Sequence, residues 1–220
     1  MTHTSPGADC NAAEFFGLVW PGKQAARAAA ETPLAAEFEL DAALSSSTTS
    51  PNSIHVADNL PVLQHWVTSG ETFDVIYIDP PYNTGRDFVY RDNYRARREV
   101  NSGSYAQWHA EWLSMMLPRL ILARRVLAEN GFIFVSIGED EAANTRKVLD
   151  EVFGEGCYAG QFIWKKAGTG KNDSKYAVVE HEYILCYAKN PDNPGFNVDA
   201  GGYTSTKYNH EDERGKYSLV

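Results

Sequence analysis

The residues best suited to chemistry in this chain are the consecutive Asp79-Pro80-Pro81-Tyr82. They bring together a carboxylate, two residues without a backbone N–H and an aromatic ring. The carboxylate of Asp79 and the carbonyl of Pro80 can each accept one N–H of an amino group on a flat ring, and Tyr82 can stack on that ring. The combination predicts methylation of an aromatic amine. The alternative is that two prolines after an aspartate simply form a turn.

The segment that must position this motif is the apolar run Phe73 to Ile78. Its continuous Val-Ile-Tyr-Ile pattern is typical of a strand that is covered on both faces, as in a parallel sheet. Ligands of such sheets bind beyond the carboxyl ends of the strands. We therefore expect Asp79 to Tyr82 to lie at a binding site.

The rest of the chain alternates between helical and strand patterns. Helices are expected at 60–67, ending at Gly70, at 104–127, stopped by Asn130-Gly131, and at 139–153. Further strands are expected at 54–56, 132–137, 161–165 and 180–188. This order predicts an α/β fold with a doubly wound, mostly parallel sheet.

Charge and composition limit the partners. With 220 residues the chain can bury a core, and its net charge of −9 argues mildly against bulk electrostatic binding of nucleic acid. Two local basic stretches soften this conclusion, the arginines of 86–98 and the lysines Lys165, Lys166, Lys171 and Lys175. Solvated loops explain either stretch equally well. There is no apolar run of membrane length, and three distant cysteines favour a reducing cytoplasm without disulfides or a metal site.

Several stretches, in this order, resemble one family. They are Val56–Leu60, Tyr77–Gly85, Asp87–Tyr90, Leu117–Leu120, Gly131–Ile137 and His181–Leu185, with Trp20–Lys23 near the start. The family is that of the permuted, β-class amino-methyltransferases of DNA. The chain looks most like the modification subunits of type III restriction systems, which methylate adenine N6.

The resemblance implies a role for each matching residue. The target adenine, flipped out of the duplex, would be held by Asp79, Pro80, Pro81 and Tyr82. S-adenosylmethionine would be bound by Asp58 and Asn59, although spacing alone makes Asp58 equally a helix cap. Double-stranded DNA or the target base would be contacted by Asn83, Thr84, Lys165, Lys166, Lys171 and Lys175. His181 and Glu182 are interpreted as structural rather than as an acid and a base.

One expected feature is missing. The family has a Phe-x-Gly-x-Gly loop for the methionine part of the cofactor, and this chain contains none. Without the strand that carries it, 74–79 would expose an unpaired apolar edge, so we expect the sheet to be incomplete. Expected partners are therefore a second copy, a restriction subunit or a complementing C-terminal chain.

The resemblance also divides the chain. Residues 1–53 are predicted to form an arm with a Ser/Thr-rich linker and a short helix at Ala25–Ala30, 54–190 the catalytic portion, and 191–220 a tail or the start of a recognition region. Two other functions stay open. One is a truncated or split DNA-binding remnant without catalysis, and the other is a methyltransferase that acts on amines of RNA or protein.

Overall fold

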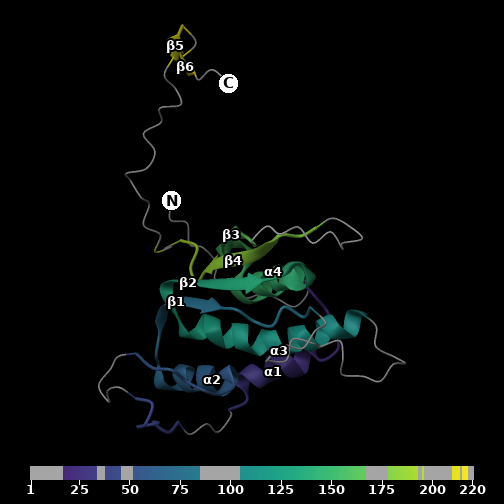
Figure 1. Ribbon diagram of the computed structural model, residues 1–220, viewed down its shortest axis with the longest axis vertical. Coiled ribbons are helices and arrows are strands. Elements are labelled where there is room, and N and C mark those ends of the chain that lie inside the picture. The colour runs from purple at the N-terminus through teal and green to yellow at the C-terminus, as the bar shows by residue number, and fades with distance from the viewer. Residues whose placement is uncertain are drawn as a thin grey trace, which may run out of the picture.

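The computed structural model describes residues 17–33, 38–45, 52–84, 105–166, 178–192, 195, 210–213 and 215–217. Its centre is a sheet with helices layered beside it (Figure 1). The helix α3 (Tyr105–Val126) lies between the sheet and the pair α1 (Lys23–Glu31) and α2 (Asn59–Ser69). The helix α4 (Glu139–Phe153) packs on both α3 and the sheet.

The sheet confirms the α/β class and is mixed. Its order is β1 (Phe73–Ile78), β2 (Leu127–Ile137), β4 (His181–Ala188) and β3 (Tyr158–Lys165). The pair β1–β2 is parallel, and the pairs β2–β4 and β3–β4 are antiparallel. Parallel neighbours need a crossover connection, which α3 supplies between β1 and β2. Two of the three strand pairs in the described sheet are thus antiparallel, whereas the sequence predicts a mostly parallel sheet.

The strand β2 begins earlier than predicted. Leu127 pairs with Phe73 and Phe132 pairs with Val75, so residues 128–131 form a bulge. The predicted helix end near Leu127 is confirmed, since α3 ends at Val126. The prediction that Asn130-Gly131 stops it is wrong, because both residues lie inside β2. A Cβ on Gly131 would lie 2.8 Å from the carbonyl oxygen of Asp74, so the close approach of β1 requires glycine here.

The predicted strand at 54–56 is also wrong, since these residues have no ladder partner in the described sheet. An isolated strand leaves its backbone groups unpaired and is not stable alone. The other predicted elements are present. The helix α2 ends at Gly70 in the left-handed conformation, with φ at 76°, and α4 has the predicted bounds.

The core lies on the helical side of the sheet. Buried side chains of β2, β4, α3 and α4 meet there, among them Ile133, Val135, Leu185, Tyr187, Trp112, Leu120 and Leu149. Each such burial contributes about 1.5–3 kcal/mol. The helix α1, which lies within the predicted arm, joins this core through Ala26. Trp20, just before α1, is also buried there, and its Nε1 donates to Ser114 Oγ at 2.9 Å.

The other face of β1 is open. Ile76 and Ile78 pack on the core, whereas the alternating Val75 and Tyr77 are 59% and 58% exposed. The prediction that this strand is covered on both faces is therefore wrong within the described part of the chain. The predicted unpaired edge is confirmed, because β1 ends the described sheet.

The remaining elements are small. A single turn of 3-10 helix, η1 (Glu155–Cys157), connects α4 to β3. The strands β5 (His210–Asp212) and β6 (Gly215–Tyr217) form a separate antiparallel pair. Among the described helices, none is both long and apolar enough to cross a membrane.

Candidate active site

The motif lies where the sequence predicts, directly beyond the carboxyl end of β1. Because β1 and β2 are parallel, their carboxyl ends meet at the same edge of the sheet, beside the start of α4. Asp79 is exposed there, while Pro80, Pro81 and Tyr82 are partly buried. An exposed carboxylate on a partly buried turn can accept a hydrogen bond from a bound molecule.

One anchor of this turn comes from α3. Trp112 is fully buried, and its Nε1 donates to the carbonyl oxygen of Pro81 at 2.6 Å. A buried carbonyl that loses its donor costs about 1–3 kcal/mol, so this bond holds the turn firmly.

The second anchor is Asn83, which follows the motif. Its φ is 57°, the left-handed region that residues other than glycine rarely adopt. The side chain is buried, and its Nδ2 donates to Glu141 Oε1 at 2.6 Å. Asn83, predicted to line the site, thus supports the turn from inside the protein. Thr84 follows it and is partly buried.

Tyr82 is fixed at both its ring and its hydroxyl group. The ring lies so close to Gly138 that a Cβ there would be 3.0 Å from Tyr82 Cδ2. The hydroxyl donates to Glu182 Oε2 at 3.4 Å. Burial, with the carboxylates of Asp79 and Glu182 nearby, raises the pKa of the Tyr82 phenol well above its usual value. Tyr82 is therefore neutral at physiological pH.

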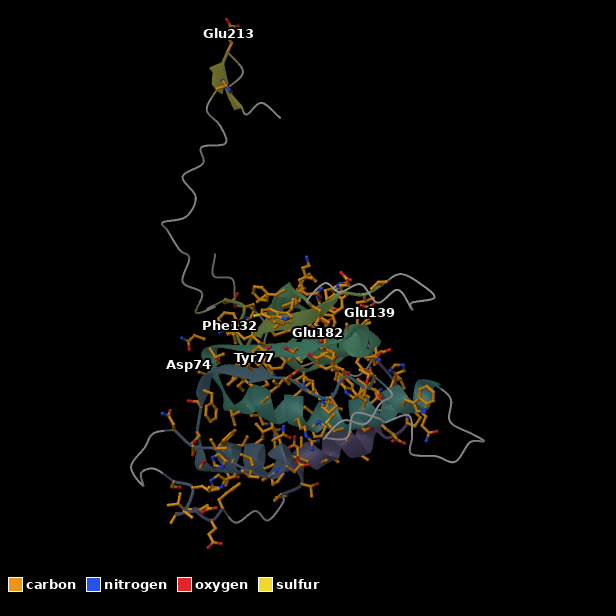
Figure 2. The ribbon with its side chains drawn as sticks, viewed as in Figure 1. Asp74, Tyr77, Phe132, Glu139, Glu182 and Glu213 are labelled. Atoms are coloured by element: carbon orange, nitrogen blue, oxygen red, sulfur yellow. The ribbon has the colours of Figure 1, made fainter. Side chains whose placement is uncertain are left out.

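Glu182 connects the motif with the predicted basic surface. It lies at the start of β4, near Glu139 and away from Asp74, as Figure 2 shows. Lys166 Nζ lies 2.6 Å from Glu182 Oε1. Lys166 is thus paired with a carboxylate, whereas Lys165 lies exposed at the end of β3. Lys171 and Lys175 lie outside the described residues.

The predicted cofactor residues lie at the start of α2. Asp58 is its N-cap, and its Oδ1 accepts the backbone N–H of Leu60 at 2.8 Å, so the capping interpretation is confirmed. Arg119 Nη2 lies 2.9 Å from both carboxylate oxygens of Asp58. Arg119 Nε also donates to Asn59 Oδ1 at 2.7 Å.

The helix α3 places the two groups of candidate residues on one support. Trp112 holds the motif, and Arg119 holds Asp58 and Asn59. Seven residues are two helical turns, so both side chains leave the same side of α3, about 10 Å apart along its axis. The two groups therefore lie along one face of one helix.

Sequence analysis missed three residues that build this site, namely Trp112, Arg119 and Glu141. Arg119 had a signal, because it lies in the matching stretch Leu117–Leu120. Trp112 and Glu141 had none, since a tryptophan and a first-turn glutamate are ordinary in amphipathic helices. Both are buried, which only the fold reveals.

The α/β sheet carries the anchored turn Asp79-Pro80-Pro81-Tyr82 at its carboxyl edge, and comparison with known proteins identifies the family. The family model described as DNA methylase matches residues 73–219. The chain therefore belongs to the DNA methylase family.

Individual relatives agree with this assignment. The Mod subunit of the type III enzyme StyLTI from Salmonella typhimurium is 39% identical over 193 residues, covering 80% of this chain and 29% of that protein. The EcoP15I Mod subunit from Escherichia coli is 38% identical, covering 80% and 31%. The type II methyltransferase M.KpnI from Klebsiella pneumoniae is 38% identical, covering 70% and 36%. The chain thus spans about a third of the length of these relatives.

A solved structure is also similar. The crystal structure of the M1.HpyAVI-SAM complex aligns with a TM-score of 0.45 and 16% identity, covering 69% of this chain and 60% of that chain.

Proposed function

We propose that this chain is the target-base part of a DNA methyltransferase that transfers a methyl group from S-adenosylmethionine to adenine N6. The observation that carries the proposal is the anchored turn Asp79-Pro80-Pro81-Tyr82 beyond β1, in a chain of the DNA methylase family. The enzyme would act in the cytoplasm as part of a restriction–modification system. DNA, a restriction subunit and a second copy are its proposed partners.

The turn supplies acceptors for the reacting amine. The exposed Asp79 carboxylate and the Pro80 carbonyl each take one N–H of the adenine amine. This draws the nitrogen towards a tetrahedral form with a localised lone pair. S-adenosylmethionine, when bound, would supply the methyl group for the new N–C bond, with the electron pair of the broken C–S bond staying on sulfur. The amine nitrogen would then lose a proton to the Asp79 carboxylate or to water. Proximity and orientation of this kind contribute about 7–11 kcal/mol.

Tyr82 supports the base. A base inside a duplex cannot reach the turn, so the adenine has to be flipped out. Stacking on an aromatic ring contributes about 1–3 kcal/mol. The contacts of Tyr82 with Gly138 and Glu182 fix the direction of its ring before the base arrives.

The cofactor supplies the methyl group, and the described residues fit one end of it. Asp58 has a side chain that is 61% exposed and held in place by Arg119, which suits an acceptor for the adenine amine of the cofactor. Asn59 lies beside it and is held by the same arginine.

Methyl transfer tests the proposal directly. The protein is incubated with S-adenosylmethionine labelled in its methyl group and with duplex DNA, RNA or a protein substrate. We expect label in DNA alone, recovered as N6-methyladenine. Label in RNA or in protein would instead support the related amine methyltransferases.

The lack of a Phe-x-Gly-x-Gly sequence and the two basic stretches favour a second candidate, a DNA-binding portion that does not bind the cofactor on its own. In the part of the chain that the structure describes, β1 also ends the sheet where the strand with that loop would pair. Calorimetry separates the two candidates. Tight binding of S-adenosylmethionine to these 220 residues excludes this second candidate. Salt-dependent DNA binding without cofactor binding supports it.

A further inference from the structure

Glu141 is a fully buried carboxylate in the first turn of α4, with an exposed fraction of 0%. Its Oε1 accepts hydrogen bonds from Asn83 Nδ2 at 2.6 Å and from His109 Nδ1 at 2.7 Å. Its Oε2 accepts one from Asn144 Nδ2 at 2.7 Å. The three donors come from the turn after the motif, from α3 and from α4.

Amide N–H groups of Asn83 and Asn144 donate to the carboxylate oxygens of Glu141. The contact of 2.7 Å between His109 Nδ1 and Glu141 Oε1 fits the tautomer of His109 that has its proton on Nδ1. The amide of Asn144 also lies 3.3 Å from this Nδ1, but two N–H donors do not bond to each other. All three short bonds therefore end on Glu141, which links three segments.

Stabilisation of α4 does not explain the burial of Glu141. Acidic side chains suit a helix N-terminus because they complement its dipole. Glu139 and Asp140 supply two such side chains in the same turn. Burying a charge costs several kcal/mol unless donors compensate for it. A third, fully buried carboxylate therefore needs another reason.

The link to Asn83 supplies that reason. Asn83 directly follows the motif, and its left-handed backbone sets the path of the chain as it leaves Tyr82. Its bond to Glu141 holds it in that conformation. Trp112, one turn after His109 on α3, holds Pro81. The turn is thus fixed at two points that leave the Asp79 carboxylate exposed.

We propose that Glu141 is a positioning residue for the target-base turn, acting through Asn83 and with His109 and Asn144 holding its carboxylate in place. The inference rests on the proposed methyltransferase function. It assigns Glu141 no contact with the base or the cofactor.

The first test uses the full protein with Glu141→Gln. The amide of the new glutamine places its own N–H against the donors that surround Glu141, so the turn loses an anchor. We therefore expect kcat for DNA methylation to fall about 10- to 100-fold, with little change in KM. The backbone N–H groups of Asp79, Tyr82, Asn83 and Thr84, which are those of residues 79–84 that can exchange, should exchange hydrogen at least tenfold faster. The matched control is Glu139→Gln, a neighbouring exposed acid of the same turn, which should change neither quantity.

Two further variants separate positioning from general stability. Asn83→Gly keeps the left-handed backbone but removes the anchor, so it should behave like Glu141→Gln. The double variant Asn83→Asp with Glu141→Gln exchanges the amide and the carboxylate, so that the two side chains can again form a hydrogen bond. Its kcat should be at least tenfold higher than that of Glu141→Gln alone. If Glu141→Gln does not fold, Asn83→Gly alone decides.

The outcomes are distinct. Unchanged exchange at 79–84 in Glu141→Gln and Asn83→Gly, with only a lower unfolding midpoint, overturns the inference. A wild-type protein without methyl transfer overturns the proposed function instead. In that case hydrogen exchange at 79–84 still decides whether Glu141 positions the turn.

Discussion

The turn Asp79-Pro80-Pro81-Tyr82 and the Asp58–Asn59 segment rest on the same helix but are held differently. The turn has buried anchors, since Trp112 and Glu141 are both fully buried. Asp58 and Asn59 lie at the surface and share one long side chain, Arg119. Exposed ion pairs contribute about 0–1 kcal/mol, whereas a buried polar group that loses its partner costs about 1–3 kcal/mol. The turn is therefore fixed in advance, and the Asp58 segment is held more weakly.

The largest expected effect separates chemistry from anchoring. Asp79→Ala removes the exposed carboxylate that we propose accepts an N–H of the reacting amine, and it should lower kcat by at least 100-fold, as loss of one preorganised group does. The unfolding midpoint should not change, because Asp79 is exposed. Methyl-transfer kinetics and thermal unfolding measure the two quantities, and unchanged methylation would remove Asp79 from the catalytic assignment.

The next effect tests the buried anchor. Trp112→Phe keeps a ring but leaves the Pro81 carbonyl without its donor, so the free energy of unfolding should fall by about 1–3 kcal/mol. Denaturant unfolding measures the change. Trp20→Phe loses a tryptophan hydrogen bond to the hydroxyl of Ser114 and is the matched control, expected to leave hydrogen exchange at 79–84 unchanged.

A smaller effect separates the two roles of Asp58. Asp58→Ala removes the N-cap of α2 and should cost about 1 kcal/mol, whereas Asp58→Asn keeps the cap and should cost little. If Asp58 also binds the cofactor, both variants weaken S-adenosylmethionine binding in calorimetry. If Asp58→Asn binds S-adenosylmethionine as tightly as the wild-type protein does, capping of α2 is the role of Asp58 and cofactor binding is not.

The smallest effect concerns Arg119. Arg119→Lys keeps the charge but loses the paired contact with both oxygens of Asp58, so stability should fall by less than about 1 kcal/mol. Cofactor affinity should fall with it, while hydrogen exchange at 79–84 stays unchanged. A change at 79–84 would show that the two regions are coupled through α3.

Sequence reasoning located the motif at the end of β1 and gave the bounds of α4, because short-range patterns determine both. It was wrong for 54–56, because a strand also requires a neighbour to pair with. It placed the stop of α3 at Asn130-Gly131, where the glycine instead allows β1 to approach a bulge. Asn130-Gly131 does interrupt regular structure, as predicted, but it does so as a bulge of β2 beside β1 and not as the end of a helix.

The sequence by itself placed the turn after a strand, offered Asp58 as a helix cap and predicted the end of α2 at Gly70, since each depends on residues a few positions apart. Only the tertiary structure decided what holds them. Trp112 lies 31 residues from Pro81, and Glu141 lies 58 residues from Asn83. Such pairs meet because α3 and α4 pack beside the sheet, and no spacing along the chain encodes that meeting. The place of β1 at the edge of the sheet, in the part of the chain that the structure describes, likewise follows from how the strands pair.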